Sequence, residues 1–516
     1  MKQKGNLDWP VLLISGGLLV LFVLTSIINE DLVGHLVNSS FNLSVQYFGA
    51  FWQVLMLATF VVAIGMAVSK YGNIQLGKKE KPEMSTFKWI SIIMCTLLAG
   101  GGVFWAAAEP MYHFLTVPPM FDGVEATTEQ AIIPALSQSF MDWGFLAWAI
   151  LGTLSAVVMM YGHYHRGMPL KPRTLLYPIF GEKIKEKSVL GTLVDSFAII
   201  AVAAGTIGPI GFLGLQAAYG LESLFGIPNV YVTQLLIIIG LITIASISAV
   251  TGIHKGIQLL SRFNVLFTLL LIIAVILLGP GAFIFDAFIG TMGTYIHSFL
   301  EISLYRGDSD WLAYWTVFFW GWFIGYGPMM AIFISRISRG RTLRELFLAV
   351  AIIAPIVTNF WFTVVGGSGI YYELLNPGSV SDALTSGGMP AAMIAITQQL
   401  PLGTLMAAAF LLVTIVFVAT TTDSMSYTIS MAITGSDNPS SGLRVFWAVV
   451  MGAVAVILLS IGEGSIGALQ SFIVVTAVPV SLILLPMIWL APKVARTLAL
   501  EQNIIKENKQ RTKKIS

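Results

Sequence analysis

The sequence predicts an all-α integral membrane protein with about twelve transmembrane helices. Hydrophobic residues make up 56% of the chain, charged residues only 10%, and the mean hydropathy is +0.83. These values lie outside the usual range of soluble domains. In addition, all but Arg306 of the 28 Lys and Arg residues fall on one side of an alternating series of apolar segments. Short loops that cross the membrane are poor in Lys and Arg. The basic side is therefore predicted to be cytoplasmic, with both termini inside the cell and the chain in the inner (plasma) membrane.

Apolar runs long enough to cross a bilayer, about 20 residues each, divide the chain. They lie near 9–28, 46–68, 87–112, 131–161, 189–218, 229–252, 258–279, 311–335, 346–368, 402–432, 443–461 and 466–490. The Gly-rich segment 281–300 resembles an interfacial helix, and 371–389 is predicted to be an external loop with one short helix. We expect three regions: two N-terminal helices with a cytoplasmic loop (1–80), a membrane-embedded core (81–490) and a solvated basic tail (491–516).

The composition also excludes several classes of protein. A net charge of +2 gives no reason to expect nucleic-acid binding, because the basic residues are explained by cytoplasmic loops. The single cysteine, Cys95, allows no disulfide within one chain. No P-loop, no G-x-S-x-G motif and no His, Asp and Glu cluster at metal-ligand spacing is found, so we expect no cofactor and no enzyme activity.

Two of the apolar runs are interrupted at their centres. The third reads AGGGVFW over 99–105, with Gly100, Gly101 and Gly102, and the eighth reads WGWFIGYGP over 320–328, with Gly325, Gly327 and Pro328. Broken backbone at membrane depth is tolerated where it is buried in protein or lines a cavity. Because the two interruptions are five spans apart, spans 3–7 and 8–12 are predicted to be inverted five-helix repeats with a site between them. The alternative is that these glycines only allow close helix packing.

Deep aromatic residues gather around the second interruption. Positions 315, 319, 322 and 326 follow the i, i+4, i+7, i+11 spacing of one helix face. Such a face can be simple packing, but beside a broken helix it favours a cage that holds a methylated ammonium group by cation–π contacts. The candidate binding residues are Trp105, Trp143, Trp148, Trp320, Trp322, Phe323 and Tyr326.

Several motifs resemble those of the betaine/carnitine/choline transporter family. The run YWTVFFWGWF (314–323) is similar to the aromatic signature of that family's eighth span, and SRISRGRTLRE (335–345) is similar to its cytoplasmic loop. Glu109–Pro110 and the run Thr421 to Ser424 also match. The resemblance covers essentially the whole chain. It implies a two-repeat fold, usually a homotrimer, that transports trimethylammonium compounds by coupling to Na⁺ or H⁺ or by exchange.

The resemblance also implies roles for individual residues. Trp143, Trp148, Trp322, Phe323 and Tyr326 match the family's cage, but Phe323, Tyr326 and Leu151 stand where larger rings are common. These smaller side chains favour a small methylated amine such as trimethylamine over glycine betaine. A Na⁺ site is implied at Thr420 and Thr421, with backbone carbonyls near Phe417, Cys95 and Leu98. Hydroxyls in membrane helices also bond back to their own helix, which is the alternative. Exchangers of the family place an arginine in the fifth span, and no Arg or Lys occurs from 191 to 251, so ion coupling is favoured.

Asp142 directly precedes Trp143 within the fourth span. A carboxylate at membrane depth costs about 2.5–3.5 kcal/mol on insertion scales and indicates function. It lies in a water-filled vestibule, pairs with a cytoplasmic or external polar group, or attracts the cation bound at the cage, above all a protonated amine that carries an N–H. An amine-conducting channel is the alternative function from another class, since aromatic residues can also line a conduction path.

Overall fold

The computed structural model describes residues 7–98, 101–185, 188–251, 254–435, 438–463 and 466–506, and of 95–98 and 254–261 the backbone alone. All regular structure in these ranges is helical, apart from an isolated β-bridge between Gln75 and Thr342. Ten helical segments are long and apolar enough to cross a membrane, or eleven if one bent pair counts as a single span. This confirms the all-α membrane fold.

The first half of the described chain contains α1 (Trp9–Ile28), α2 (Glu30–Val68), α3 (Thr86–Leu98), α4 (Gly102–Leu115), α5 (Ile132–Trp143), α6 (Phe145–Gly152), α7 (Leu154–Met160), α8 (Tyr177–Phe180), α9 (Val189–Phe225), α10 (Tyr231–Thr251), α11 (His254–Leu278) and α12 (Gly281–His297). The second half contains α13 (Phe299–Ser303), α14 (Ser309–Tyr314), α15 (Thr316–Ile337), α16 (Leu343–Leu348), α17 (Ala354–Phe362), α18 (Ser368–Leu375), α19 (Ser381–Gly387), α20 (Ala392–Gln399), α21 (Gly403–Thr434), α22 (Ser441–Ile461), α23 (Gly467–Leu484) and α24 (Met487–Glu501).

The third predicted span is present as two short helices. α3 ends at Leu98 and α4 begins at Gly102, with Gly101 (φ −148°, ψ −17°) as a non-helical N-cap. The predicted interruption at the glycines is therefore confirmed, although Gly100 lies outside the described residues. The fourth span is interrupted as well, at Gly144 between α5 and α6 and at Thr153 between α6 and α7. After the seventh span, the chain turns by 104° into α12, as expected for an interfacial helix.

The eighth span is also interrupted, but the predicted position was wrong. α15 continues through Gly325, Gly327 and Pro328, and the chain leaves helical geometry at Trp315 (φ −116°, ψ −99°). A proline removes one donor from a helix, and membrane helices tolerate this where neighbouring groups compensate. A Cβ at Gly327 would lie 2.7 Å from Leu484 Cδ1, and one at Gly325 would lie 3.5 Å from Ala201 Cβ. Close packing, the alternative interpretation, therefore explains Gly327, whereas a Cβ at Gly325 would make only an ordinary contact.

The predicted solvated tail was also wrong in its first part. Residues 487–501 form α24, which buries Leu490, Ala491, Val494 and Leu498. These apolar residues recur at three- and four-residue spacing, which produces one buried helix face despite the low overall hydropathy. Gln502 then bonds to the backbone of Gln75, donating to its carbonyl (2.7 Å) and accepting from its N–H (2.8 Å).

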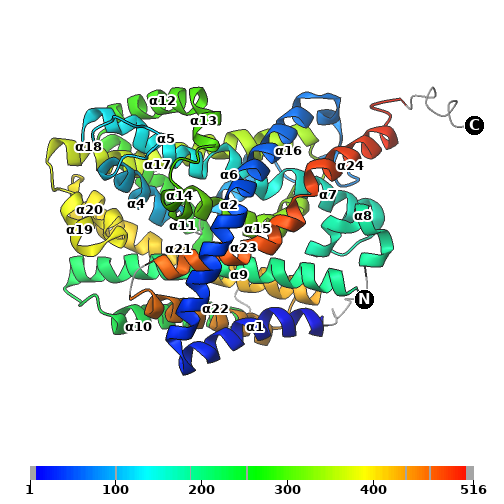
Figure 1. Cartoon of the computed structure of the whole chain (residues 1–516), viewed down its shortest axis with the longest axis horizontal. Helices are drawn as coiled ribbons and strands as arrows, with labels where there is room; N and C mark the ends of the chain where they lie inside the picture. The colour runs from blue at the N-terminus through cyan, green and yellow to red at the C-terminus, as the bar shows by residue number, and fades with distance from the viewer. Residues whose placement is uncertain are drawn as a thin grey trace, which may run out of the picture.

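The basic segments gather at one end of the molecule. In Figure 1 the first turn of α1, α8 and α24 lie at the right, whereas α18, α19 and α20 lie at the left. Within the basic end, Arg344 donates to the carbonyl of Ala67 (2.8 Å) and Arg339 pairs with Glu83 (3.3 Å). This arrangement agrees with the predicted separation of basic from non-basic loops.

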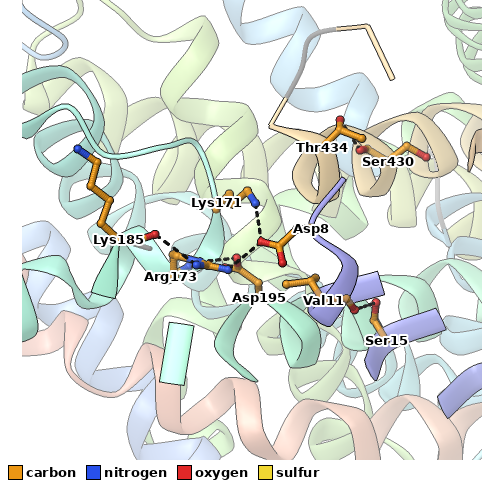
Figure 2. Close-up of polar contacts among 9 residues, drawn as sticks. All are labelled: Asp8, Val11, Ser15, Lys171, Arg173, Lys185, Asp195, Ser430 and Thr434. Carbon is orange, nitrogen blue, oxygen red and sulfur yellow. Dashed lines mark hydrogen bonds and ion pairs between the residues drawn. The ribbon is translucent and has the colours of Figure 1, made fainter. Parts of the chain in front are cut away.

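A buried ion-pair network joins the start of α1 to the loop before α9 and to α9 itself. Figure 2 shows Asp8 between Lys171 and Arg173, with Arg173 pointing to Asp195. Arg173 Nε donates to Asp195 Oδ2 at 2.6 Å, and Asp8 Oδ2 lies 3.0 Å from Lys171 Nζ and 3.2 Å from Arg173 Nη2. The side chains of Arg173 and Asp195 are 5% and 1% exposed. Such a pair stabilises only as a pair, because either charge alone would be buried without a partner.

We therefore expect Asp195→Asn to destabilise the fold by about 1.5–3 kcal/mol, the usual contribution of a hydrogen bond to a charged group, because Arg173 keeps Asp8 as a partner. The measurement is the apparent unfolding temperature of the purified protein in detergent. Glu182→Gln serves as control, because Glu182 pairs with Lys185 at 3.8 Å on the surface. An unfolding temperature for Asp195→Asn equal to that of the control variant would show that the network does not stabilise the fold.

Candidate functional site

Trp322 of α15 lies between two glycines of other helices. A Cβ at Gly101, in the interruption of the third span, would lie 2.2 Å from Trp322 Cη2. On the other side Gly205 of α9 accepts a hydrogen bond from Trp322 Nε1 at 3.1 Å. A Cβ at Gly205 would lie 2.2 Å from Tyr326 Cε2 and 3.1 Å from Trp322 Nε1. The two glycines thus let the indole ring pack directly against backbone from both sides.

The rings of Trp143, Phe319, Trp322 and Phe323 form what we call the aromatic cluster. Trp143 reaches it from the end of α5, and the other three come from α15. The ring centroid of Trp143 lies 5.2 Å from that of Phe319, 5.9 Å from that of Trp322 and 5.3 Å from that of Phe323. The contacts with Trp322 and Phe323 are edge-to-face, so in each of them a ring edge meets an electron-rich ring face. All four residues are less than 9% exposed.

Other rings extend the aromatic cluster. Trp105 of α4 joins it through Phe319, at a centroid distance of 4.8 Å. Tyr326 lies one turn further along α15, where its hydroxyl is 3.3 Å from that of Thr206. Two further rings were not predicted from the sequence: Phe212 of α9 lies 5.8 Å from Trp322, and Phe362 of α17 lies 5.1 Å from Trp143. Neither shows a sequence signal, since only the packing of α9 and α17 brings them there.

Two of the candidate residues lie apart from the aromatic cluster. Trp148 donates from Nε1 to Thr358 Oγ1 of α17 at 3.0 Å. Trp320 is fully buried on another face of α15. In the described part of the chain, neither makes a ring contact with the aromatic cluster. Of the predicted cage, the structure thus brings together Trp143, Trp322 and Phe323, with Tyr326 and Trp105 at its margins.

Titratable side chains cluster directly behind Trp143, contrary to the expectation that none would. Glu109, His113 and Asp142 bring one nitrogen or oxygen atom each to within 4.8 Å of one another. Glu109 and His113 are one turn apart on α4, and Asp142 comes from α5, so the cluster forms only when the two helices pack. Trp143 Nε1 donates to Glu109 Oε2 at 2.7 Å. Asp142 is fully buried in this structure, not in an open vestibule.

The candidate Na⁺ residues lie on α21, which is an unbroken helix. Thr420 donates to the carbonyls of Val416 (2.8 Å) and Phe417 (3.2 Å). The buried hydroxyl of Thr421 has no hydrogen-bond partner among the described residues. The side chains of Cys95 and Leu98 lie outside the described residues. α3 ends at Leu98 in the described part of the chain, so Cys95 and Leu98 lie in its last described turn.

Comparison with known proteins shows which family has this sequence pattern. The family model described as "BCCT, betaine/carnitine/choline family transporter" matches residues 10–500. The chain belongs to this family. It is therefore a multi-pass membrane transporter and not an enzyme.

Individual relatives of this BCCT family member agree. The chain is 53% identical over 505 residues to a protein of Vibrio parahaemolyticus named glycine betaine transporter 2, covering 98% of this chain and 93% of the relative. It is 32% identical to an ectoine/hydroxyectoine transporter of Virgibacillus pantothenticus, covering 94% and 96%. It is 31% identical to the glycine betaine transporter OpuD of Bacillus subtilis, covering 95% and 94%. Two of these three relatives are named for glycine betaine, and the third is named for ectoine and hydroxyectoine.

Proposed function

We propose that this protein takes up a trimethylammonium-type compound by secondary active transport coupled to Na⁺, with the aromatic cluster as its binding site. The observation that carries the proposal is the meeting of Trp143, Trp322 and Phe323 beside the interrupted third span. A methylated ammonium group has little or no hydrogen-bonding capacity, so ring faces are suitable partners for it. The names of two relatives add glycine betaine and ectoine as compounds that such transporters carry.

In the described conformation the rings contact one another, so a cation enters only when they separate. The non-helical linker at Gly101 touches Trp322, and Gly144 interrupts the helix directly after Trp143. Each of the two central tryptophans is thus next to a glycine whose backbone dihedral angles are not helical. This placement supports binding coupled to movement of the interrupted spans, as expected for two inverted repeats that alternate access.

Within this class of substrates, we propose trimethylamine and glycine betaine as the first compounds to compare. Phe323 and Tyr326 give less ring area than tryptophans would, which favours a small methylated amine. No Lys or Arg lies on α5, α6 or α9, or on α15 before Arg336, to bind a substrate carboxylate. We further propose a homotrimer in the inner membrane, with both termini in the cytoplasm.

The Na⁺ assignment predicts the effect of Thr421→Ala. The unpartnered hydroxyl of Thr421 is proposed as an ion ligand, so its loss should raise the Na⁺ concentration for half-maximal uptake. The effect should be smaller at saturating Na⁺, because linkage passes the lost ion affinity to the substrate. Uptake into proteoliposomes at graded Na⁺ is the measurement.

Thr422→Ala is the matched control, because Thr422 is buried and its hydroxyl donates to Val418 of its own helix at 2.8 Å. It should leave the Na⁺ dependence unchanged. Wild-type uptake that ignores Na⁺ would refute the assignment and favour proton coupling or exchange.

A further inference from the structure

Three buried titratable residues behind Trp143, namely Glu109, His113 and Asp142, have more hydrogen-bonding atoms than hydrogen-bond partners. Glu109, His113 and Asp142 are each 0% exposed. Glu109 Oε2 accepts from Trp143, and Asp142 Oδ2 accepts from Gln138 Nε2 at 3.0 Å. Glu109 Oε1, Asp142 Oδ1 and both ring nitrogens of His113 have no hydrogen-bond partner among the described residues. His113 Nε2 faces Glu109 Oε1 at 3.7 Å, too far for a hydrogen bond. Buried polar atoms usually have a partner, so this set indicates a missing ligand.

The charge balance indicates a positive ligand. The elements packed against α4 and α5 include α6, α9, α12, α13, α15, α17, α18 and α20. Their one Lys or Arg residue is Arg336, about 30 Å along α15 from the Thr316 end that Gln138 contacts. Two ionised carboxylates this close, buried and without a cation, would be strongly unfavourable.

Other titratable groups on the surrounding elements do not supply that charge. Five acids and one histidine are exposed: Glu129, Glu222, Asp286, Glu301, Asp310 and His297. Asp195 pairs with Arg173, and Glu373 accepts from the backbone N–H groups of Gly378, Val380 and Ser381. Tyr295 is buried, and its hydroxyl accepts from the N–H of Phe145 at 3.1 Å. The charge must therefore come from outside the protein.

We propose that Glu109 and Asp142 bind one exchangeable proton between them, behind the aromatic cluster, while His113 stays neutral. A proton gives one of the free oxygens a donor and leaves a single negative charge behind Trp143. A metal ion fits less well. One oxygen of each carboxylate already accepts a hydrogen bond, so the protein offers two oxygens and one imidazole nitrogen, and a metal ion would need water to complete its four or more ligands.

This proton site would act on substrate binding through Trp143, a role that rests on the proposed function. The indole of Trp143 donates to Glu109 on one side and contacts Trp322 and Phe323 on the other. A hydrogen bond to an ionised carboxylate is shorter and stronger than one to a neutral acid. The position of the proton therefore influences the position of the Trp143 ring. By linkage, a cation bound at the ring must change the proton affinity by the same factor as the proton changes the cation affinity.

The direct test is infrared spectroscopy of the purified full-length protein without substrate at neutral pH. A protonated buried carboxyl gives a C=O stretching band that is separate from carboxylate bands and shifts in deuterium oxide. We expect this band in the wild type and in the control Asp286→Asn, whose residue is an exposed acid on the neighbouring α12. Glu109→Gln and Asp142→Asn should each remove or shift it, and Asp142→Glu should restore a band. Thermal unfolding establishes that each variant is folded.

Two results would overturn the proposal. A band that is unchanged in both variants, or that responds to only one of them, would exclude a shared proton. Stoichiometric metal in the purified protein, lost in both variants, would assign the cluster to a metal ion instead. Because the spectrum requires no substrate, it decides on the proton site even if no methylated ammonium compound binds. Proton release or uptake on adding trimethylamine or glycine betaine in weak buffer then tests the coupling. The wild type should show it, and Glu109→Gln should not.

Discussion

Replacing Trp322 by Leu is expected to weaken substrate binding by at least about 30-fold. A cation–π contact in a desolvated site contributes about 2 kcal/mol or more, and each 1.4 kcal/mol is a tenfold change in affinity. The same change removes the hydrogen bond from the indole to the carbonyl of Gly205, which holds the ring in place. Calorimetric titration of the purified protein with glycine betaine and with trimethylamine measures the effect.

Trp320→Leu is the matched control, because it removes the same side chain from the same helix. Trp320 is as deeply buried as Trp322 but makes no ring contact with the aromatic cluster in the described chain. Both variants should lose stability, since each leaves a hole in a packed interior. Only Trp322→Leu should lose affinity. Equal affinities for the two variants would remove the aromatic cluster as the binding site.

Gly205→Ala should also weaken substrate binding, by roughly tenfold. The added methyl would lie 2.2 Å from the Tyr326 ring and 3.1 Å from Trp322 Nε1, so both side chains must shift. Overpacking of this kind typically costs about 1–3 kcal/mol. Because two binding residues move, part of that cost appears as lost affinity.

Gly240→Ala on α10 is the control for replacing a helical glycine by alanine, because a Cβ at Gly240 would have no neighbouring atom within 4 Å. Its affinity and stability should match the wild type. Gly101→Ala, which would push Trp322 from the opposite side, should behave like Gly205→Ala. Unchanged binding in both Gly205→Ala and Gly101→Ala would show that the position of Trp322 does not matter for the substrate.

Hydropathy and periodicity predicted much of the fold. The first span was predicted at 9–28 and is α1, Trp9–Ile28. The helical spacing of positions 319 and 322 correctly placed Phe319 and Trp322 on the face that meets Trp143. These features depend on local sequence and on the bilayer, which is the same solvent for every span. A single sequence is therefore enough to predict them.

Features that depend on packing between helices were predicted less well. Gly325, Gly327 and Pro328 look like a helix break in sequence, but Leu484 of α23 explains Gly327 as a close contact. The group of Glu109, His113 and Asp142 has a sequence signal only in the four-residue spacing of its first two members. Asp142 joins them because α5 packs against α4, and no periodicity within either helix encodes that contact.

The most direct test of the proposed function is uptake of radiolabelled glycine betaine and trimethylamine into proteoliposomes that contain the wild-type protein. One set of vesicles has an inward Na⁺ gradient, and a second set has K⁺ in place of Na⁺. We predict saturable accumulation of at least one of the two compounds above its external concentration, only with the Na⁺ gradient. Flux that does not saturate, or that merely equilibrates the compound whichever cation is present, would contradict Na⁺-coupled transport and indicate a channel.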